Sequence, residues 1–344
     1  MNILGIESSC DETACAVVRD GREVLSNVVY TQIPLHQPYG GVVPEVASRA
    51  HIEKIHGVVA EAMRGVDALD AVAVTYGPGL ASSLLVGLNA AKGLALALGV
   101  PLIGINHIEA HLHTPFLFDA PGDGTPPPAP EDALPALGLA VSGGHTTWVD
   151  MPDYGAYTII GQTLDDAAGE AFDKIARVLG LPYPGGPRID KLAHEGQPTI
   201  DFPRALQEKG NYEFSFSGLK SAVLNYINSE RMKGHELNLP DIAASFQSSV
   251  VEVLAHKAFE ALEASGLDTL VLAGGVAANS ALEARLREGA AKRGVKFYFP
   301  DRILCTDNAA MIACRGYYQA QAGAYSDLYL NAVPGLSLQD VGED

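Results

Sequence analysis

Short apolar runs separated by polar or glycine-containing turns dominate the chain. Residues 2–7, 13–19 and 23–29 form three such runs and predict a meander of three strands that begins with a buried one. Residues 71–75 and 101–105 predict two further buried strands, and residues 82–98 between them predict an alanine- and leucine-rich helix. A strand, a glycine turn, an apolar helix and a second strand make a βαβ unit, so the pattern predicts an α/β fold.

The pattern of the first strands returns later in the chain, at a constant offset of 133. Residues 137–146, laid without gaps on residues 4–13, match at Leu, Gly, Ser and Thr. Four identities in ten can arise by chance, but each copy is also a strand, a turn and a second strand followed by helices and strands. We therefore predict a duplicated architecture, whose two hairpins enclose a cleft and direct backbone N–H groups at a nucleotide's phosphates.

Length and composition set the expected domain limits. A chain of 344 residues exceeds the size at which single cores usually stop growing. Residues 119–135 are rich in proline and are predicted to be a linker or insertion without chemistry. We expect a first domain of residues 1–118 with 315–335, a second of residues 136–314, and an acidic tail of residues 336–344. Helices are predicted over residues 46–63, 240–265 and 280–293, and residues 211–220 are predicted to form a loop.

Composition and charge narrow the classes of function. The chain is 47% hydrophobic with 36 glycines, which is typical of a folded α/β protein. A net charge of −18 argues against binding nucleic acid through a large basic surface, so an RNA substrate would need a local basic patch or a basic partner. The chain contains no uninterrupted apolar run of about 18 residues and no basic leader, which predicts a cytoplasmic protein without a membrane span. Its four cysteines form no CxxC pair, so we expect reduced thiols.

Two histidines four residues apart, His107 and His111, follow the strand predicted at residues 101–105. On a helix they share one face and can hold one metal ion, although such a pair can equally make only hydrogen bonds to the backbone. A zinc protease is the first alternative. Its HExxH signature places the base directly after the first histidine, where this chain has Ile108, and Glu109 is displaced by about 100° around the helix.

Polar clusters supply the other candidate residues. The turn after the first strand carries Asp11 and Glu12, which form either a solvated turn or part of a site. The helix after the second hairpin has an acidic face, which is either solvated or part of a site. In the second case Asp173 and the later Asp190 would point into the cleft and accept hydrogen bonds from substrate hydroxyls. The strand, glycine pair and helix at residues 268–293 favour contact with a nucleotide or tight packing.

Three further side chains have simple structural interpretations. His51 and His56 are five residues apart, so they do not share one helix face, and both are predicted to be solvated or to face a partner. Asp307 is predicted to cap the last apolar helix.

Seven motifs, taken together, resemble the family of catalytic subunits that synthesise tRNA threonylcarbamoyladenosine, formerly classed as glycoproteases. They are ESSCDET at residues 7–13, GVVPE with ASRAH at 41–51, HIEAH at 107–111, VSGGHT at 141–146, GEAFDK at 169–174, GGVAAN at 274–279 and TDN at 306–308. The resemblance covers roughly residues 2 to 330 in order. It implies the duplicated actin-like, sugar-kinase-like ATPase fold, with two related domains around a nucleotide cleft.

The resemblance also implies a reaction, in which a threonylcarbamoyl group moves from its adenylate to the exocyclic amine of the adenosine beside the anticodon. The tRNAs concerned read codons that start with A. By family motif, one divalent metal ion would be bound by His107, His111 and Asp307. Iron is the favoured ion and zinc the alternative. Residues that would bind the adenylate are Ala140, Val141, Ser142, Gly143, Gly144, Asp173, Gly186, Asp190 and Asn279. Glu12 and Asp11 are candidate general bases.

The same resemblance implies partners. These are the tRNA anticodon loop and, in bacteria, an inactive paralogue-like dimer partner and a small ATPase. No membrane partner is implied. Whether ATP or ADP also binds in the cleft is not decided by the resemblance. Ser221 stands where the family often has Thr, and residues 334–344 lack an arginine common there, which puts contacts of the tail in doubt. A sugar-kinase-like phosphotransferase and a non-enzymatic scaffold are the remaining alternatives, because a fold does not fix a function.

Overall fold

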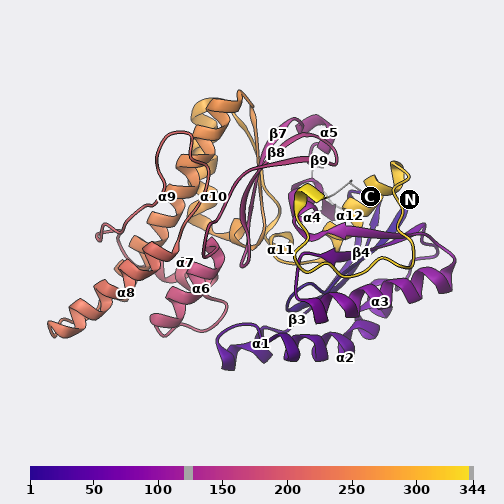
Figure 1. The fold of residues 1–344 in the computed structure, drawn as a ribbon, viewed down its shortest axis with the longest axis horizontal. Coiled ribbons are helices and arrows are strands. Elements are labelled where there is room, and N and C mark those ends of the chain that lie inside the picture. The colour runs from indigo at the N-terminus through magenta and orange to yellow at the C-terminus, as the bar shows by residue number, and fades with distance from the viewer. Residues whose placement is uncertain (120–126, 341–344) are drawn as a thin grey trace. The chain divides into compact units, whose positions relative to one another are not determined.

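The chain folds into two compact units, and its computed structural model describes residues 1–119 and 127–340. The first unit comprises Met1–Ala133 with Pro300–Asp344, and the second comprises Leu134–Phe299 (Figure 1). Residues 120–126 of the expected linker and residues 341–344 of the expected tail lie outside the described residues. The chain returns to the first unit at residue 300, before the expected residue 315, because the segment between these positions packs in the first unit.

A mixed six-stranded sheet, in the order β5-β4-β1-β2-β3-β6, forms the centre of the first unit. Three strands form the predicted antiparallel meander, and β4 and β5 run parallel to β1. The strands are β1 (Asn2–Glu7), β2 (Glu12–Arg19), β3 (Glu23–Thr31), β4 (Ala71–Gly77), β5 (Leu102–Asn106) and β6 (Phe118–Asp119). The helices are α1 (Ile33–His36), η1 (Gln37–Tyr39), α2 (Pro44–Ala62), α3 (Ala81–Leu98), α4 (His107–His113), η2 (Thr114–Phe116), α5 (Pro130–Ala133), α11 (Arg302–Cys305), α12 (Ala309–Gln321) and η4 (Leu338–Asp340).

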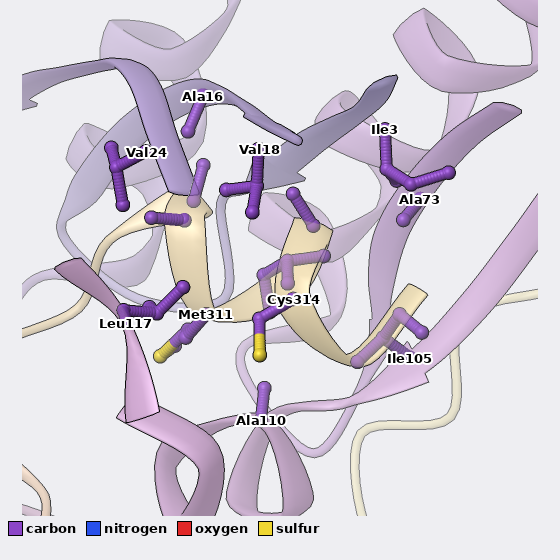
Figure 2. Packing of buried hydrophobic residues seen from close by; sticks show 14 of the residues in the cluster. Ile3, Ala16, Val18, Val24, Ala73, Ile105, Ala110, Leu117, Met311 and Cys314 are labelled. Carbon is purple, nitrogen blue, oxygen red and sulfur yellow. The ribbon is translucent and has the colours of Figure 1, made fainter. Parts of the chain in front are cut away.

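Apolar side chains on both faces of this sheet build two cores. Leu4 and Ile6 of β1 point toward α2 and α3, whereas Ile3 on the same strand points toward α12, as the two-residue period of a strand requires. Figure 2 shows the second of these cores, in which Met311 and Cys314 of α12 lie against the strands. The sheet is therefore covered on both faces, which explains why β1 reads as a continuous apolar run.

The second unit repeats this plan with five strands in the order β11-β10-β7-β8-β9. Its strands are β7 (Ala136–Val141), β8 (Thr146–Asp153), β9 (Ala156–Gln162), β10 (Thr269–Ala273) and β11 (Lys296–Tyr298). Its helices are α6 (Ala168–Val178), α7 (Gly185–Ala193), α8 (Ser217–Met232), α9 (Leu239–Ser265), η3 (Gly275–Ala278) and α10 (Ser280–Arg293). Helix α8 occupies part of residues 211–220, where a loop was predicted. The loop prediction holds for residues 211–216 and was wrong from Ser217 on, because Leu219, Val223 and Ile227 place an apolar stripe on this segment.

The predicted duplication is confirmed by the strand pairing. In the first unit Leu4 lies opposite Val17, and in the second Leu137 lies opposite Asp150, so both partners shift by the same 133 residues. Both sheets also share the strand order from the parallel edge through the antiparallel meander. The weak sequence repeat therefore reflects the same hydrogen-bond register in both hairpins.

Helix α3 is long and apolar enough to cross a membrane by length and composition alone, although Asn89 and Lys92 interrupt its apolar sequence. It packs against β4 and α2, and its buried residues include Leu84, Leu88 and Ala91. One such helix is weak evidence for a membrane span, and the buried face of α3 belongs to the core of the first unit.

The interpretation of His51 as solvated was wrong, while His56 is exposed as expected. The His51 ring is buried between α2 and the sheet, with Nδ1 2.8 Å from Thr13 Oγ1 and Nε2 3.0 Å from the Cys10 carbonyl oxygen. Its place on the face of α2 that packs against β2 decided its environment.

Candidate functional site

Helix α4 places the two histidines as the sequence predicted. Asn106 ends β5 and caps this helix, since its side-chain oxygen accepts hydrogen bonds from the backbone N–H groups of Ile108 and Glu109. The histidine rings then lie one turn apart, with their centroids 4.7 Å from each other and their planes nearly perpendicular. Both side chains are buried, so the polar ring atoms need partners within the protein.

Asp307 completes a group of three potential metal ligands. Its Oδ1 lies 3.0 Å from His111 Nε2 and 3.5 Å from His107 Nε2. One ligand atom from each of the three residues falls within 4.8 Å of the others. The prediction that Asp307 caps the last helix was wrong, because the adjacent Asn308 caps α12 through Met311 N–H, while Asp307 faces α4.

A buried carboxylate behind this group orients His107. Glu7, at the end of β1, lies with Oε2 3.1 Å from His107 Nδ1, and it also accepts hydrogen bonds from Thr75 Oγ1 and Ser9 N–H. Burial alone would raise the pKa of Glu7, but the neighbouring His107 holds it below its usual value. Because Nδ1 of His107 faces this carboxylate, its Nε2 is the atom turned toward Asp307.

The charges of this cluster also set the protonation of His107. Burial would lower the pKa of the imidazole, but Asp307 and Glu7 raise it to about 9. A cationic His107 therefore balances two carboxylates when these residues face one another directly.

The three residues fit a divalent metal ion by their chemistry. Two imidazole nitrogens and one carboxylate oxygen on one side of a cluster match the facial donor set of mononuclear iron sites, and zinc accepts the same donors. The carboxylate behind His107 supplies the outer hydrogen bond that a metal-bound imidazole needs to fix its tautomer. These observations support a donor set for one divalent metal ion.

The carboxylates of the first hairpin turn lie in the same unit. Glu12 begins β2, and its Oε1 accepts a hydrogen bond of 3.2 Å from Thr31 Oγ1. Burial, followed by the charges of Asp11 and Asp307, raises the pKa of Glu12 well above its usual value. Asp11 is buried and Glu12 is half-buried, so this turn is not simply a solvated one.

In the second unit, the β7–β8 turn meets two glycine-containing segments. Ser142 accepts a hydrogen bond from the N–H of Gly169 in α6, and a Cβ on Gly274 would lie 2.4 Å from the Val141 carbonyl oxygen. Gly274 also has a φ of +92°, which favours glycine. Gly143 and Gly144 are exposed with open space beside them, whereas the side chains of Ala140 and Val141 are buried in the sheet.

The other residues predicted to bind the adenylate have structural contacts as well. Asp173 accepts a hydrogen bond of 2.6 Å from Gly185 N–H at the start of α7, and Asp190 accepts one of 2.8 Å from Ser280 Oγ. Asn279 caps α10 and donates a hydrogen bond to Gln247. Gly186, in the first turn of α7, has open space beside it. Asp190 and Asn279 thus meet at the N-terminus of α10.

Comparison with known proteins decides the family. Residues 23–314 match the family model of tRNA N6-adenosine threonylcarbamoyltransferase. The chain belongs to this family. The curated protein of that name from Desulfitobacterium hafniense (strain Y51) is 53% identical over 343 residues, covering 98% of both chains. The one from Clostridioides difficile (strain 630) is 54% identical over 340 residues, covering 97% of this chain and 98% of its relative.

Solved structures agree on the fold at much lower identity. Full-length HypF in its phosphate- and nucleotide-bound form matches with a TM-score of 0.59 at 17% identity, covering 94% of this chain and 47% of that one. The activator of 2-hydroxyisocaproyl-CoA dehydratase from Clostridium difficile with bound ADPNP matches with a TM-score of 0.53 at 13% identity, covering 94% and 97%. These are actin-like, sugar-kinase-like ATPase folds, which confirms the predicted fold class.

The sequence motifs gave no role to several residues around the three potential metal ligands. Glu7 was seen only as part of a motif, although a carboxylate inside a buried strand is a signal for a buried partner. Glu109 was considered only as a displaced protease base. Its Oε1 accepts a hydrogen bond from Arg315 Nε, so its carboxylate is held in a buried ion pair and the protease alternative loses its base.

Proposed function

We propose that this chain transfers the threonylcarbamoyl group from threonylcarbamoyl-adenylate to the exocyclic amine of the adenosine next to the anticodon in tRNAs that read A-starting codons. Membership of the threonylcarbamoyltransferase family supports the reaction class. The group formed by the buried His107 and His111 with the half-buried Asp307 is the observation in the structure that carries the proposal. In this reaction the amine nitrogen bonds to the carbamoyl carbon, the bond from that carbon to the phosphate oxygen breaks, and AMP leaves with the electron pair.

The three ligands would hold one divalent ion, for which iron is favoured and zinc is the alternative. When bound, the ion would supply a Lewis acid that offsets negative charge on phosphate or carbonyl oxygen. The protein's own task is to present two neutral Nε2 atoms and one carboxylate together. Glu7 holds the proton of His107 at Nδ1, which leaves Nε2 as the donor.

Glu12 is the better of the two candidates for the base that takes the proton from the attacking amine, with Asp11 as its neighbour. Its pKa is raised by burial and by nearby carboxylates, and a carboxylate with a raised pKa is a stronger proton acceptor. The negative charge of Asp307 contributes to this shift, which supports a position of Glu12 near the proposed metal ligands.

The second unit would bind the adenylate. Exposed Gly143 and Gly144 leave the backbone of the β7–β8 turn open to a phosphate, while Asp190 and Asn279 offer oxygen and amide groups near the start of α10. Asp173 and Gly186 lie at the adjacent contact of α6 with α7. ATP or ADP would use the same groups if it acts as a regulator.

The remaining parts of the proposal concern partners and location. An anticodon loop is single-stranded and can present its bases in a pocket, so an acidic protein needs only a local basic rim or partner subunits to hold tRNA. A paralogue-like dimer partner and a small ATPase are the subunits that we expect. We place the chain in the cytoplasm, where tRNA is found and where its four free cysteines would stay reduced.

The decisive experiment is reconstitution. The chain is incubated with ATP, threonine, bicarbonate, its partner enzymes and unmodified tRNA, and the tRNA is digested so that its nucleosides can be identified by mass spectrometry. We expect threonylcarbamoyladenosine with the wild-type chain and none with His111→Ala. If the wild-type chain with cognate partners yields no threonylcarbamoyladenosine, the proposed reaction is wrong.

A further inference from the structure

A buried ion pair joins the two segments that carry the metal ligands. Glu109 lies between the two histidines on α4 and is fully buried, and Arg315 lies on α12 with 6% exposure. Arg315 Nε donates a hydrogen bond to Glu109 Oε1. Because Asp307 directly precedes the cap of α12, this pair ties the helix of the histidines to the helix that follows the aspartate.

Glu109 points away from the metal ligands. It is two residues from each histidine, which is about 200° around an α-helix. Its carboxylate thus holds the back of α4 while the histidines face Asp307 on the front. The start of α4 has separate attachments, because Asn106 donates to the Ser337 carbonyl oxygen and His107 contacts Glu7.

The surroundings of the pair do not favour charge. Ala110, Met311 and Cys314 belong to the apolar core between α4 and α12 (Figure 2). Glu109 Oε2 has no hydrogen-bond partner among the described residues, so the desolvation of the carboxylate is only partly compensated. Apolar side chains of similar size usually stabilise such a position as well as an ion pair does, so packing alone does not explain the charges.

The geometry of metal binding supplies a reason. Side-chain atoms lie roughly 5 to 6 Å from a helix axis, so rotating α4 by about 15° would move the histidine nitrogens by roughly 1.5 Å. Ligand distances in metal sites vary by only about ±0.2 Å. A short helix of seven residues therefore needs an attachment beyond its N-terminus to keep both histidines in place.

We propose that the Glu109–Arg315 pair is a positioning element that fixes the rotation of α4 so that His107 and His111 meet Asp307 at metal-binding distance. The inference rests on the metal site of the proposed function. It assigns to these two residues no contact with the substrate.

The test compares folding with metal affinity in the full-length chain. The double variant Glu109→Met with Arg315→Met replaces both charges by apolar groups of similar length. Its thermal midpoint should lie close to that of the wild type. The affinity for Zn²⁺, measured by competition with a chromophoric chelator, should stay at least about tenfold weaker than in wild type. Co²⁺ absorption should also change, because it reports the geometry of the ligands.

Glu109→Asp provides a second measurement that keeps both charges. The shorter side chain would either draw α4 toward Arg315 or lose the contact with Arg315, so we expect weaker Zn²⁺ binding. The thermal midpoint should be nearer to that of the wild type than the midpoint of Glu109→Ala is. This variant decides the question if the double variant does not fold. Arg285→Met is the matched control, since it removes an interhelical pair with Glu252 in the second unit and should leave Zn²⁺ affinity unchanged.

The outcomes separate two kinds of failure. If wild type binds no Zn²⁺, or if His111→Ala binds it equally well, the metal site of the proposed function is wrong. If wild type binds Zn²⁺ through His111 and both the folded double variant and Glu109→Asp bind it as tightly, the positioning role is wrong while the metal site stands.

Discussion

Replacing Glu7 by Gln removes the charge behind His107 while keeping the size of the side chain. The wild-type carboxylate accepts hydrogen bonds from His107 Nδ1, Ser9 N–H and Thr75 Oγ1, and it is fully buried. An amide can accept some of these bonds but carries no charge, and its NH₂ group can oppose the Nδ1–H of the imidazole.

The expected magnitude follows from this one contact. A hydrogen bond to a charged group contributes about 1.5–3 kcal/mol, which corresponds to roughly 10- to 150-fold in an equilibrium constant. We expect the metal affinity of Glu7→Gln, compared at high pH where His107 is neutral, to fall by about 10- to 100-fold. This range agrees with the usual effect of replacing the outer partner of a metal-bound histidine.

The pH dependence gives a second and sharper signature. In the metal-free wild type the pKa of His107 is about 9, so metal binding must release a proton below that pH. Apparent affinity should therefore rise about tenfold per pH unit up to about pH 9. In Glu7→Gln the pKa of His107 falls toward its usual range. The rise of apparent metal affinity with pH should therefore end at a lower pH, and the affinity at the plateau should be weaker.

The assay is Zn²⁺ competition between the protein and a chelator at several pH values, with thermal unfolding as a check on folding. Thr75→Val is the control, because it removes one donor to Glu7 but keeps the carboxylate beside His107. Equal plateau affinities and equal pH profiles for wild type and folded Glu7→Gln would refute the orienting role of Glu7.

Three further predictions concern other parts of the chain. Asp307→Ala should lose bound metal and tRNA modification together while remaining folded, and modification by a metal-free Asp307→Ala protein would contradict a role for the metal. Burial opposes ionisation of Asp165, but hydrogen bonds from Ser215 and Ser217 lower its pKa to about 2. Asp165→Asn should therefore be less stable than wild type above about pH 4, with the difference vanishing as the pH falls toward 2; a difference in urea unfolding that does not change with pH would contradict this. Gly274→Ala should destabilise the protein by about 1–3 kcal/mol because its φ is +92° and a Cβ would meet the Val141 carbonyl; an unchanged midpoint in urea would show that the backbone adjusts without cost.

The main strands and several long helices could be predicted because their local signals are strong. The apolar runs of β1 and β7 and the glycine that ends α9 determine elements whose existence hardly depends on distant contacts. The offset of 133 between the two hairpins was also present in the sequence, since register is encoded by which positions are apolar. The spacing of His107 and His111 was likewise sufficient to place them on one helix face.

Partners distant in sequence required the folded chain. Asp307 had a sufficient local explanation as a cap, and only the packing of α12 on α4 turned it toward two histidines about 200 residues earlier. The partnerships of Glu7 with His107 and of Glu109 with Arg315 have no local pattern, because a buried charge is stabilised by whatever the tertiary structure places beside it. His51 was misjudged for the same reason. The sequence by itself determined the main strands and several long helices, whereas packing decided which polar side chains meet.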